Sequence, residues 1–232
     1  MLVSFWSCDG EFVTEDLADA WVRPFERLAP VRRLVQFKGQ RNFTGAWWCA
    51  KTGAHVGFES WVERDQLMLL DFAPEVVGIG SQPFAIDLQT ASGPRRHVPD
   101  YFVRQVDGSV VVIDVRPDGL VGDDDVVFEA TAQACALVGW GYRRLGRPMA
   151  VLVENVRWLA GYRHPRCARP QLRAQALELV GEAGLPLGDL AWLLGGPVTT
   201  LATLFHMLWN HELRTEIQAR PLSMGSLVQA GG

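Results

Sequence analysis

Three features that often define a protein class are missing from this chain. Its four cysteines, Cys8, Cys49, Cys135 and Cys167, stand far apart without a CxxC pair, and the five histidines are scattered too. This spacing argues against a disulfide framework or a zinc site. No run approaches the roughly 18 apolar residues of a membrane span. The opening MLVSFWSCDGEF lacks the basic head and long apolar core of a signal peptide. We therefore expect a cytoplasmic protein without a membrane partner.

Lysine is also scarce, and the basic residues are unevenly distributed. The net charge of −4 at pH 7 argues by itself against a simple nucleic-acid coat. However, residues 28–58 contain five basic residues and no acid, and residues 140–173 contain eight arginines and one acid. Such clusters can follow a phosphate backbone, although they can also be ordinary solvated faces. The candidate DNA contacts within them are Lys38, Arg41, Arg143 and Arg144.

The order of predicted elements favours an α/β fold. The 232 residues are 48% hydrophobic and 21% charged, which is typical of globular domains. A helix is expected near 15–28, short strands in RLVQF and GAWWCA, a helix in ESWVERDQLMLLDF, and two strands in EVVGIGSQPFAIDLQ. A hairpin, a helix over 126–138, the strand GYRRL and a helix in VENVRWLAGYR follow. This order predicts helices flanking a central mixed sheet.

Breaks in the pattern predict three parts. Residues 1–57 form a β-rich extension on the core, residues 58–163 form the main α/β domain, and the Pro-rich segment 164–170 is a linker. Residues 171–232 contain three helical stretches followed by two short strands around a Pro-containing turn. Three helices followed by a hairpin are the outline of a winged-helix module.

The predicted hairpin carries the most unusual charges of the chain. Its apolar run Ser109–Ile113 ends at Asp114 and Arg116, and Asp100 stands fourteen residues before Asp114. A two-residue turn would point the two aspartates to opposite faces. A three-residue loop ending in Gly108, a residue that readily adopts a left-handed conformation, would make Asp100 face Asp114, with Arg116 on the same face. The sequence leaves the register open, but only the second option makes chemical sense of both acids.

Facing carboxylates predict a cation site. Cβ atoms of opposed residues lie about 5 Å apart, so two ionised aspartates need a cation or a shared proton. Mg²⁺, with oxygen ligands at about 2.1 Å, fits between Asp100 and Asp114, whereas neither strand offers a histidine for zinc there. Glu59 and Glu63 share a helix face, and one of them could complete the site. Alternatively, the aspartates are strand-end surface residues and the glutamates belong to a solvated helix face.

The same residues resemble the motif of the PD-(D/E)xK nuclease superfamily. Pro99-Asp100 matches the PD, and Asp114-Val115-Arg116 matches the (D/E)xK with arginine in place of lysine. The resemblance implies a restriction-endonuclease-like sheet and metal-dependent hydrolysis.

A closer resemblance covers residues 58–145, which are similar to the TnsA-like endonuclease subunit of heteromeric transposases. The matching segments are ESWVERDQLMLLDFAPEVVGIGSQP, VPDYFV, VVVIDVRP and GWGYRRLG. The Ser60-x-x-Glu63 spacing and Gln82-Pro83 are the more specific parts. Proteins of this family also carry a winged-helix-like domain in the C-terminal part of the chain.

The resemblance implies roles for five acidic or basic residues. Asp100, Asp114 and Glu63 would bind Mg²⁺, with Mn²⁺ as a substitute, and position the attacking water. Arg116 takes the place of the catalytic lysine, Glu59 is the alternative to Glu63, and Gln82 is a supporting residue. The implied reaction is hydrolysis of a DNA phosphodiester at a transposon end. The implied partners are double-stranded DNA, a DDE-type transposase subunit and an ATPase regulator.

Arg116 is the main departure from the family pattern. Arginine remains charged, so it can stabilise negative charge but cannot act as a base. The arginine is consistent with a working nuclease in an arginine-rich chain. It is also consistent with a catalytically weakened DNA-binding and assembly subunit, and a stand-alone defence nuclease is a third possibility.

The last predicted helix, in VTTLATLFHMLWNHEL, is nearly uncharged. A helix that reads DNA bases normally exposes Arg, Lys or Asn. We therefore expect the C-terminal domain to contact a protein more than it reads DNA bases.

Overall fold

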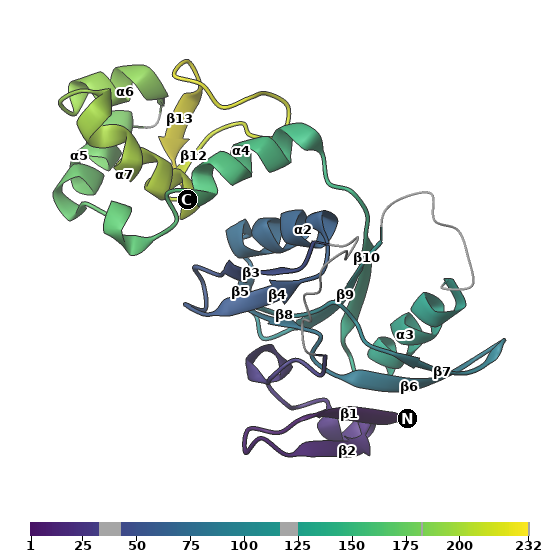
Figure 1. Cartoon of the computed structure of the whole chain (residues 1–232). Coiled ribbons are helices and arrows are strands. Elements are labelled where there is room, and N and C mark those ends of the chain that lie inside the picture. The colour runs from purple at the N-terminus through teal and green to yellow at the C-terminus, as the bar shows by residue number, and fades with distance from the viewer. Residues whose placement is uncertain (33–42, 117–124, 182, 232) are drawn as a thin grey trace. The chain divides into compact units, whose positions relative to one another are not determined.

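The computed structural model describes residues 1–32, 43–116, 125–181 and 183–231 (Figure 1). The chain forms two compact units, Met1–Arg147 and Pro148–Gly232. Helices and several sheets occur together, which confirms the predicted α/β class. None of the helices in the described ranges combines the length and apolar character needed to cross a bilayer.

Most strands belong to the N-terminal unit. Its elements in chain order are β1 (Leu2–Trp6), β2 (Phe12–Asp16), α1 (Leu17–Ala20), η1 (Phe25–Arg27), β3 (Gly45–Trp48), β4 (His55–Phe58), α2 (Trp61–Phe72), β5 (Val76–Ser81), β6 (Ala85–Thr90), β7 (Gly93–His97), β8 (Tyr101–Gln105), β9 (Val110–Val115), α3 (Asp125–Leu137) and β10 (Gly141–Leu145).

A mixed sheet forms the centre of this unit. Its strand order is β10-β9-β8-β5, with β10 parallel to β9 and the other neighbours antiparallel. Strand β9 is buried along its whole length, which explains its uninterrupted apolar run up to Asp114. A second sheet has the order β2-β1-β6-β7, and β3 pairs with β4.

The two faces of the central sheet pack against different helices. Alternate residues of β9 enter different core clusters, Val111 and Ile113 with Leu67 of α2, and Val110 and Val112 with Ala134 of α3. Figure 1 accordingly shows α2 and α3 on opposite sides of the sheet. By the same alternation, Asp114 lies on the α3 side.

The hairpin register is the one that brings the two aspartates opposite each other. Tyr101 pairs with Ile113, so Asp100 and Asp114 occupy the next facing positions. The Gln105 N–H donates to the Ser109 carbonyl at 2.9 Å, and Gly108 has a φ of 85°. The predicted three-residue loop ending in a left-handed glycine is therefore confirmed.

Several other element predictions are confirmed, and one is wrong. The helix expected near 15–28 is replaced by the end of β2, the short helix α1 and η1. Strand β2 runs as far as Asp16 by pairing with β1, and the Asp16 side chain caps α1, which reaches only Ala20. Tertiary pairing thus overrides the local helical pattern. Strand β7 was not predicted, and RLVQF lies outside the described residues.

The C-terminal unit begins earlier than the predicted linker. Its elements are α4 (Ala150–Ala160), η2 (Pro165–Cys167), α5 (Pro170–Val180), β11 (Leu185–Pro186), α6 (Leu187–Leu193), α7 (Pro197–Trp209), β12 (Leu213–Arg214) and β13 (Leu227–Ala230). The sequence pattern assigns α4 to the middle domain, whereas the structure places it in this unit.

Helix α7 is the central helix of the C-terminal unit. Its residues from Thr203 to Trp209 are all buried, while Val198 at its start is fully exposed. The Asn155 side chain of α4 donates to the carbonyls of Ile217 and Arg220, both at 2.8 Å, and so holds the segment before β13. A helix buried in this way presents little side-chain surface to a ligand.

Candidate functional site

The candidate site lies where β8 begins and β9 ends. Asp100 directly precedes β8, and its carboxylate accepts a hydrogen bond from the Val115 N–H at 2.7 Å. This bond continues the contact between the two strands just before the start of β8. It fixes the Asp100 side chain beside the last residue of β9.

Asp100 is the acid that interacts with the others. Burial, the negative charges of Glu63 and Asp114, and more weakly that of Glu59, raise the pKa of its carboxyl group well above the usual range. The Val115 N–H opposes this shift in part. Asp100 thus interacts electrostatically with both Glu63, which belongs to α2 on one side of the sheet, and Asp114, which lies on the α3 side.

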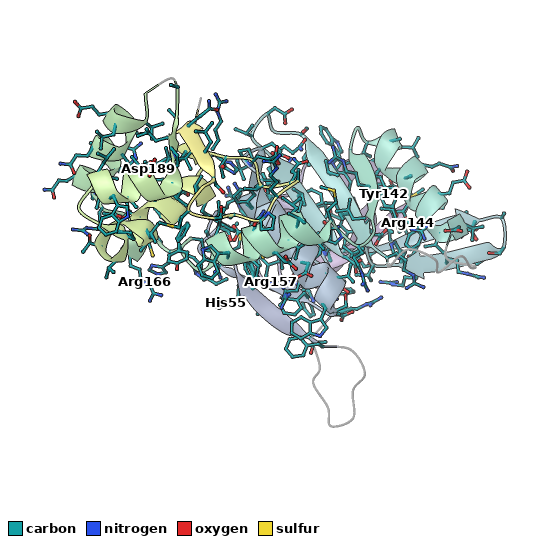
Figure 2. The ribbon with its side chains drawn as sticks, turned by 90° about the horizontal axis from the view of Figure 1, so that it is seen from above. His55, Tyr142, Arg144, Arg157, Arg166 and Asp189 are labelled. Carbon is teal, nitrogen blue, oxygen red and sulfur yellow. The ribbon has the colours of Figure 1, made fainter. Side chains whose placement is uncertain are left out.

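Asp114 is held by two donors from outside the hairpin. The Nε2 atom of His97 lies 3.0 Å from Oδ1 and 2.9 Å from Oδ2 of Asp114. The Tyr142 hydroxyl donates to Oδ2 at 2.7 Å. His97 ends β7, and Tyr142 lies on β10 two residues before Arg144; Figure 2 labels both of these β10 residues.

Glu63 completes a capping box at the start of α2. The Glu63 N–H donates to the Ser60 hydroxyl oxygen at 3.1 Å, while the Glu63 carboxylate accepts from the Ser60 hydroxyl at 2.9 Å and the Glu59 N–H at 2.7 Å. These contacts satisfy N–H groups that the helix itself leaves unpaired. Burial raises the pKa of the Glu63 carboxyl group. The Ser60-x-x-Glu63 spacing therefore has a structural reason in addition to any catalytic one.

The predicted ligands are neighbours, yet they do not meet at one point. In the described part of the chain, no group of three or more His, Cys, Asp or Glu side chains is arranged to hold a metal ion. The oxygens of Glu63 face the helix cap and those of Asp114 face His97 and Tyr142. Glu59 lies beside this group and forms a long ion pair with Arg32 at 3.9 Å.

Neither a protein-family model nor a curated protein matches this sequence.

Arg116 and Gln82 lie at the same end of the sheet. The Arg116 N–H donates to the Leu145 carbonyl at 2.8 Å, so the residue directly follows β9 beside β10. The Gln82 N–H donates to the Asp100 carbonyl at 2.8 Å, and Gln82 has an unusual φ of 47°. Its buried side-chain Oε1 has no hydrogen-bond partner among the described residues. A buried acceptor without a donor is compatible with a nearby cation.

The candidate DNA contacts are only partly described. Arg143 and Arg144 are both exposed on β10. Arg144 is bound to α3, because its guanidinium lies 2.5 Å from Asp125 and 4.8 Å from the ring centroid of Phe128. Lys38 and Arg41 lie outside the described residues.

Sequence reasoning missed His97 and Tyr142. The signal for His97 was its place three residues before Asp100, in the segment HVPD, but its contact with Asp114 depends on the unpredicted strand β7. Tyr142 could have been found from the parallel pairing of β10 with β9, where Tyr142 is opposite Val112 and therefore on the same face as Asp114. Both contacts require knowledge of strand order, which local patterns do not supply.

Proposed function

We propose that this chain is a metal-dependent DNA endonuclease subunit of a heteromeric transposase, acting on a phosphodiester at transposon ends. The observation that carries the proposal is the facing pair Asp100, just before β8, and Asp114, near the end of β9, with Glu63 close enough to raise the pKa of Asp100. Together with the mixed sheet between α2 and α3, this supports a restriction-endonuclease-like core. Strand-end acids that oppose one another's ionisation are common at functional sites.

The chemistry of the donor set fits a hard divalent cation. Asp100, Asp114 and Glu63 offer carboxylate oxygens, which Mg²⁺ and Mn²⁺ prefer, and the negative charges near Asp100 lack full compensation. Gln82 adds a buried amide oxygen. A divalent cation held there would lower the pKa of a bound water and neutralise charge on the phosphate.

The residues of the chain would prepare the phosphodiester for attack. The Val115 N–H fixes Asp100, and the capping box fixes Glu63, so the acids need little reorganisation. The guanidinium of Arg116 would stabilise negative charge on the phosphate as water attacks phosphorus and the leaving oxygen departs. Arg116 would not accept the proton of that water, because its guanidinium remains protonated.

The C-terminal unit supports the same assignment. Helices α5, α6 and α7 with the sheet β11-β13-β12 have the outline of a winged-helix module. The helix in the recognition position, α7, is mostly buried and uncharged, whereas Trp192 and Leu193 at the end of α6 are 71% and 62% exposed. Exposed apolar side chains beside a buried helix favour a protein partner over base recognition. The partners we propose are the DDE-type transposase and the ATPase regulator.

A cleavage assay tests the proposal. The full chain, the transposase encoded beside it and labelled duplex carrying the flanking genomic DNA are combined with Mg²⁺, Mn²⁺ or chelator. We expect cutting that requires the metal and falls at least about 100-fold in Asp100→Asn and Asp114→Asn. Asp19→Asn, an exposed aspartate of α1, is the matched control and should cut normally. Metal-independent cutting, or full activity of Asp114→Asn, would contradict the proposal.

Arg116 favours a second candidate, a DNA-binding and assembly subunit with weakened catalysis. Arg116→Lys separates the two in the same assay. An endonuclease should retain or increase its cutting with lysine at this position. If neither the wild-type chain nor Arg116→Lys cuts, and neither binds Mn²⁺ in calorimetry, the assembly role replaces the endonuclease. Cutting without any transposase would instead indicate a stand-alone nuclease.

A further inference from the structure

The most buried acid of the candidate site has its own pair of hydrogen-bond donors. The Asp114 side chain is only 4% exposed, and His97 beside it is 17% exposed. A carboxylate in such a position is strongly destabilised unless donors satisfy its oxygens. His97 and Tyr142 are these donors, at 2.7–3.0 Å.

The two donors come from different sheets. His97 is the last residue of β7, which pairs with β6 in the sheet β2-β1-β6-β7. Tyr142 lies on β10, beside β9 in the central sheet. Asp114 is therefore clamped by one donor from its own sheet, Tyr142, and one from the other sheet, His97. Only Val98 and Pro99 separate His97 from Asp100, so the same short segment places the second aspartate of the pair.

Packing fixes both donor side chains. The His97 ring meets the ring of Phe128 on α3 edge to face, with centroids 6.0 Å apart and an interplanar angle of 80°. Tyr142 packs against the core cluster on the α3 side of the sheet. The Tyr142 hydroxyl donates to Oδ2 of Asp114 at 2.7 Å. Because a carboxylate oxygen accepts, the His97 tautomer facing Asp114 carries hydrogen on Nε2.

We propose, on the basis of the function proposed above, that His97 and Tyr142 are positioning residues that set the orientation of the Asp114 carboxylate. Oδ2 accepts the Tyr142 hydroxyl and shares the His97 N–H with Oδ1, so Oδ1 keeps the larger remaining acceptor capacity. The clamp thereby selects the oxygen that Asp114 offers to a cation. Neither donor itself contacts the reacting phosphate or the cation.

Calorimetric titration of the full chain with Mn²⁺ is the main test. Tyr142→Phe removes one hydroxyl, and His97→Phe removes the imidazole donor while retaining a ring against Phe128. We expect both variants to bind Mn²⁺ about 10–100-fold more weakly than wild type, which is the usual effect of losing a partner of a metal ligand. His97→Gln, which again offers an N–H at the end of its side chain, should recover most of the affinity.

The matched control is His55→Phe. His55 is exposed on β4, and Figure 2 labels both His55 and Tyr142. This variant should bind Mn²⁺ as wild type does. Circular dichroism and thermal unfolding of each variant show whether it is folded. If His97→Phe does not fold, Tyr142→Phe, which removes only one hydroxyl, still tests the proposal.

Pulsed electron paramagnetic resonance of bound Mn²⁺ separates a positioning histidine from a ligand. We expect no coupling from a directly bound imidazole nitrogen in the wild-type chain. A coupling that disappears in His97→Gln would make His97 a metal ligand and overturn the proposal. Unchanged Mn²⁺ affinity in folded Tyr142→Phe and His97→Phe would overturn it as well, while leaving the endonuclease proposal intact.

Failure of the endonuclease proposal has a different signature. If wild type and Asp114→Ala alike fail to bind Mn²⁺, the metal-dependent function is refuted. The side-chain ¹⁵N spectrum of His97 then decides about the clamp. Hydrogen on Nε2 in wild type and a mixed tautomer in Asp114→Ala would show the hydrogen bond without a metal site. The same tautomer mixture in both would refute the clamp itself.

Discussion

At the scale of single residues, Asp100 is where burial and like charge act in the same direction. Its carboxyl group is surrounded by protein, and Glu63, Asp114 and Glu59 all oppose its ionisation. The Val115 N–H, which donates to this carboxylate, favours its ionisation. A chain that retains such an arrangement gives up stability at neutral pH, which is typical of sites kept for function.

Asp100→Asn should therefore stabilise the metal-free protein. The pKa of Asp100 is raised on folding, so the folded state loses stability as pH rises from the unfolded value of about 3.9 toward the folded value. Above that range the asparagine variant should have a Tm about 2–4 °C higher, the effect of roughly 1 kcal/mol in a chain of this size. Asparagine can still accept the Val115 N–H through its amide oxygen.

Differential scanning calorimetry at several pH values measures this effect. The difference in Tm should shrink toward pH 4, where both chains are neutral at position 100. Saturating Mn²⁺ should also reduce it, because the metal stabilises only the chain that binds it. A variant less stable than wild type at pH 7.5 would show that Asp100 is a structural acid and that its charge is compensated.

At the scale of elements, α2 gives one glutamate two possible roles. The capping box explains why serine and glutamate stand three residues apart at its start, without any catalysis. Glutamine also serves in a capping box, since its amide oxygen can accept the Glu59 N–H and its amide group can hydrogen-bond with the Ser60 hydroxyl. Only a metal-binding role requires the negative charge.

Glu63→Gln should therefore leave the helix intact and weaken Mn²⁺ binding. We expect a Tm within about 2 °C of wild type, because the cap is retained and a change of about 0.5 kcal/mol shifts Tm by no more than about 2 °C in a chain of this size. Mn²⁺ affinity from calorimetry should fall at least about tenfold. The matched control is Glu11→Gln, on the exposed turn before β2. Gln66→Glu is unsuitable as a control because the Gln66 side chain donates to the Gly146 carbonyl. Wild-type affinity in Glu63→Gln would reduce Glu63 to a helix cap.

Elements whose signals are local could be predicted from the sequence. Helix α2 has its serine cap and a proline after its end, and Gly108 supplies the left-handed residue that fixes the register of β8 and β9. The short helix α1 could not be predicted, because the pairing of β2 with β1 extends that strand to Asp16 and delays the start of the helix. Strand β7 could not be predicted either, because it forms by pairing with β6. For the same reason the aspartates were found from the sequence, whereas the donors to Asp114 were not.

At the scale of the whole molecule, the candidate site belongs to one unit. Both core clusters that enclose the central sheet contain only residues of Met1–Arg147, and so do all the hydrogen bonds of Asp100, Asp114 and Glu63 described above. The Gln66 side chain connects α2 to the end of this unit by donating to the Gly146 carbonyl at 2.8 Å. The C-terminal unit has its own core around α7 and contributes none of these contacts.

A fragment of residues 1–147 should therefore fold alone and keep the proposed metal site. We expect cooperative thermal unfolding and an Mn²⁺ affinity within about twofold of the full chain, since distant changes without shared partners are nearly additive. Residues 148–232 should bind no Mn²⁺. In transposase-dependent cleavage the fragment should lose activity, because we assign partner contacts to the C-terminal unit. A folded fragment that no longer binds Mn²⁺ would show that the C-terminal unit completes the site, and one that cuts as the full chain does would remove its partner-binding role.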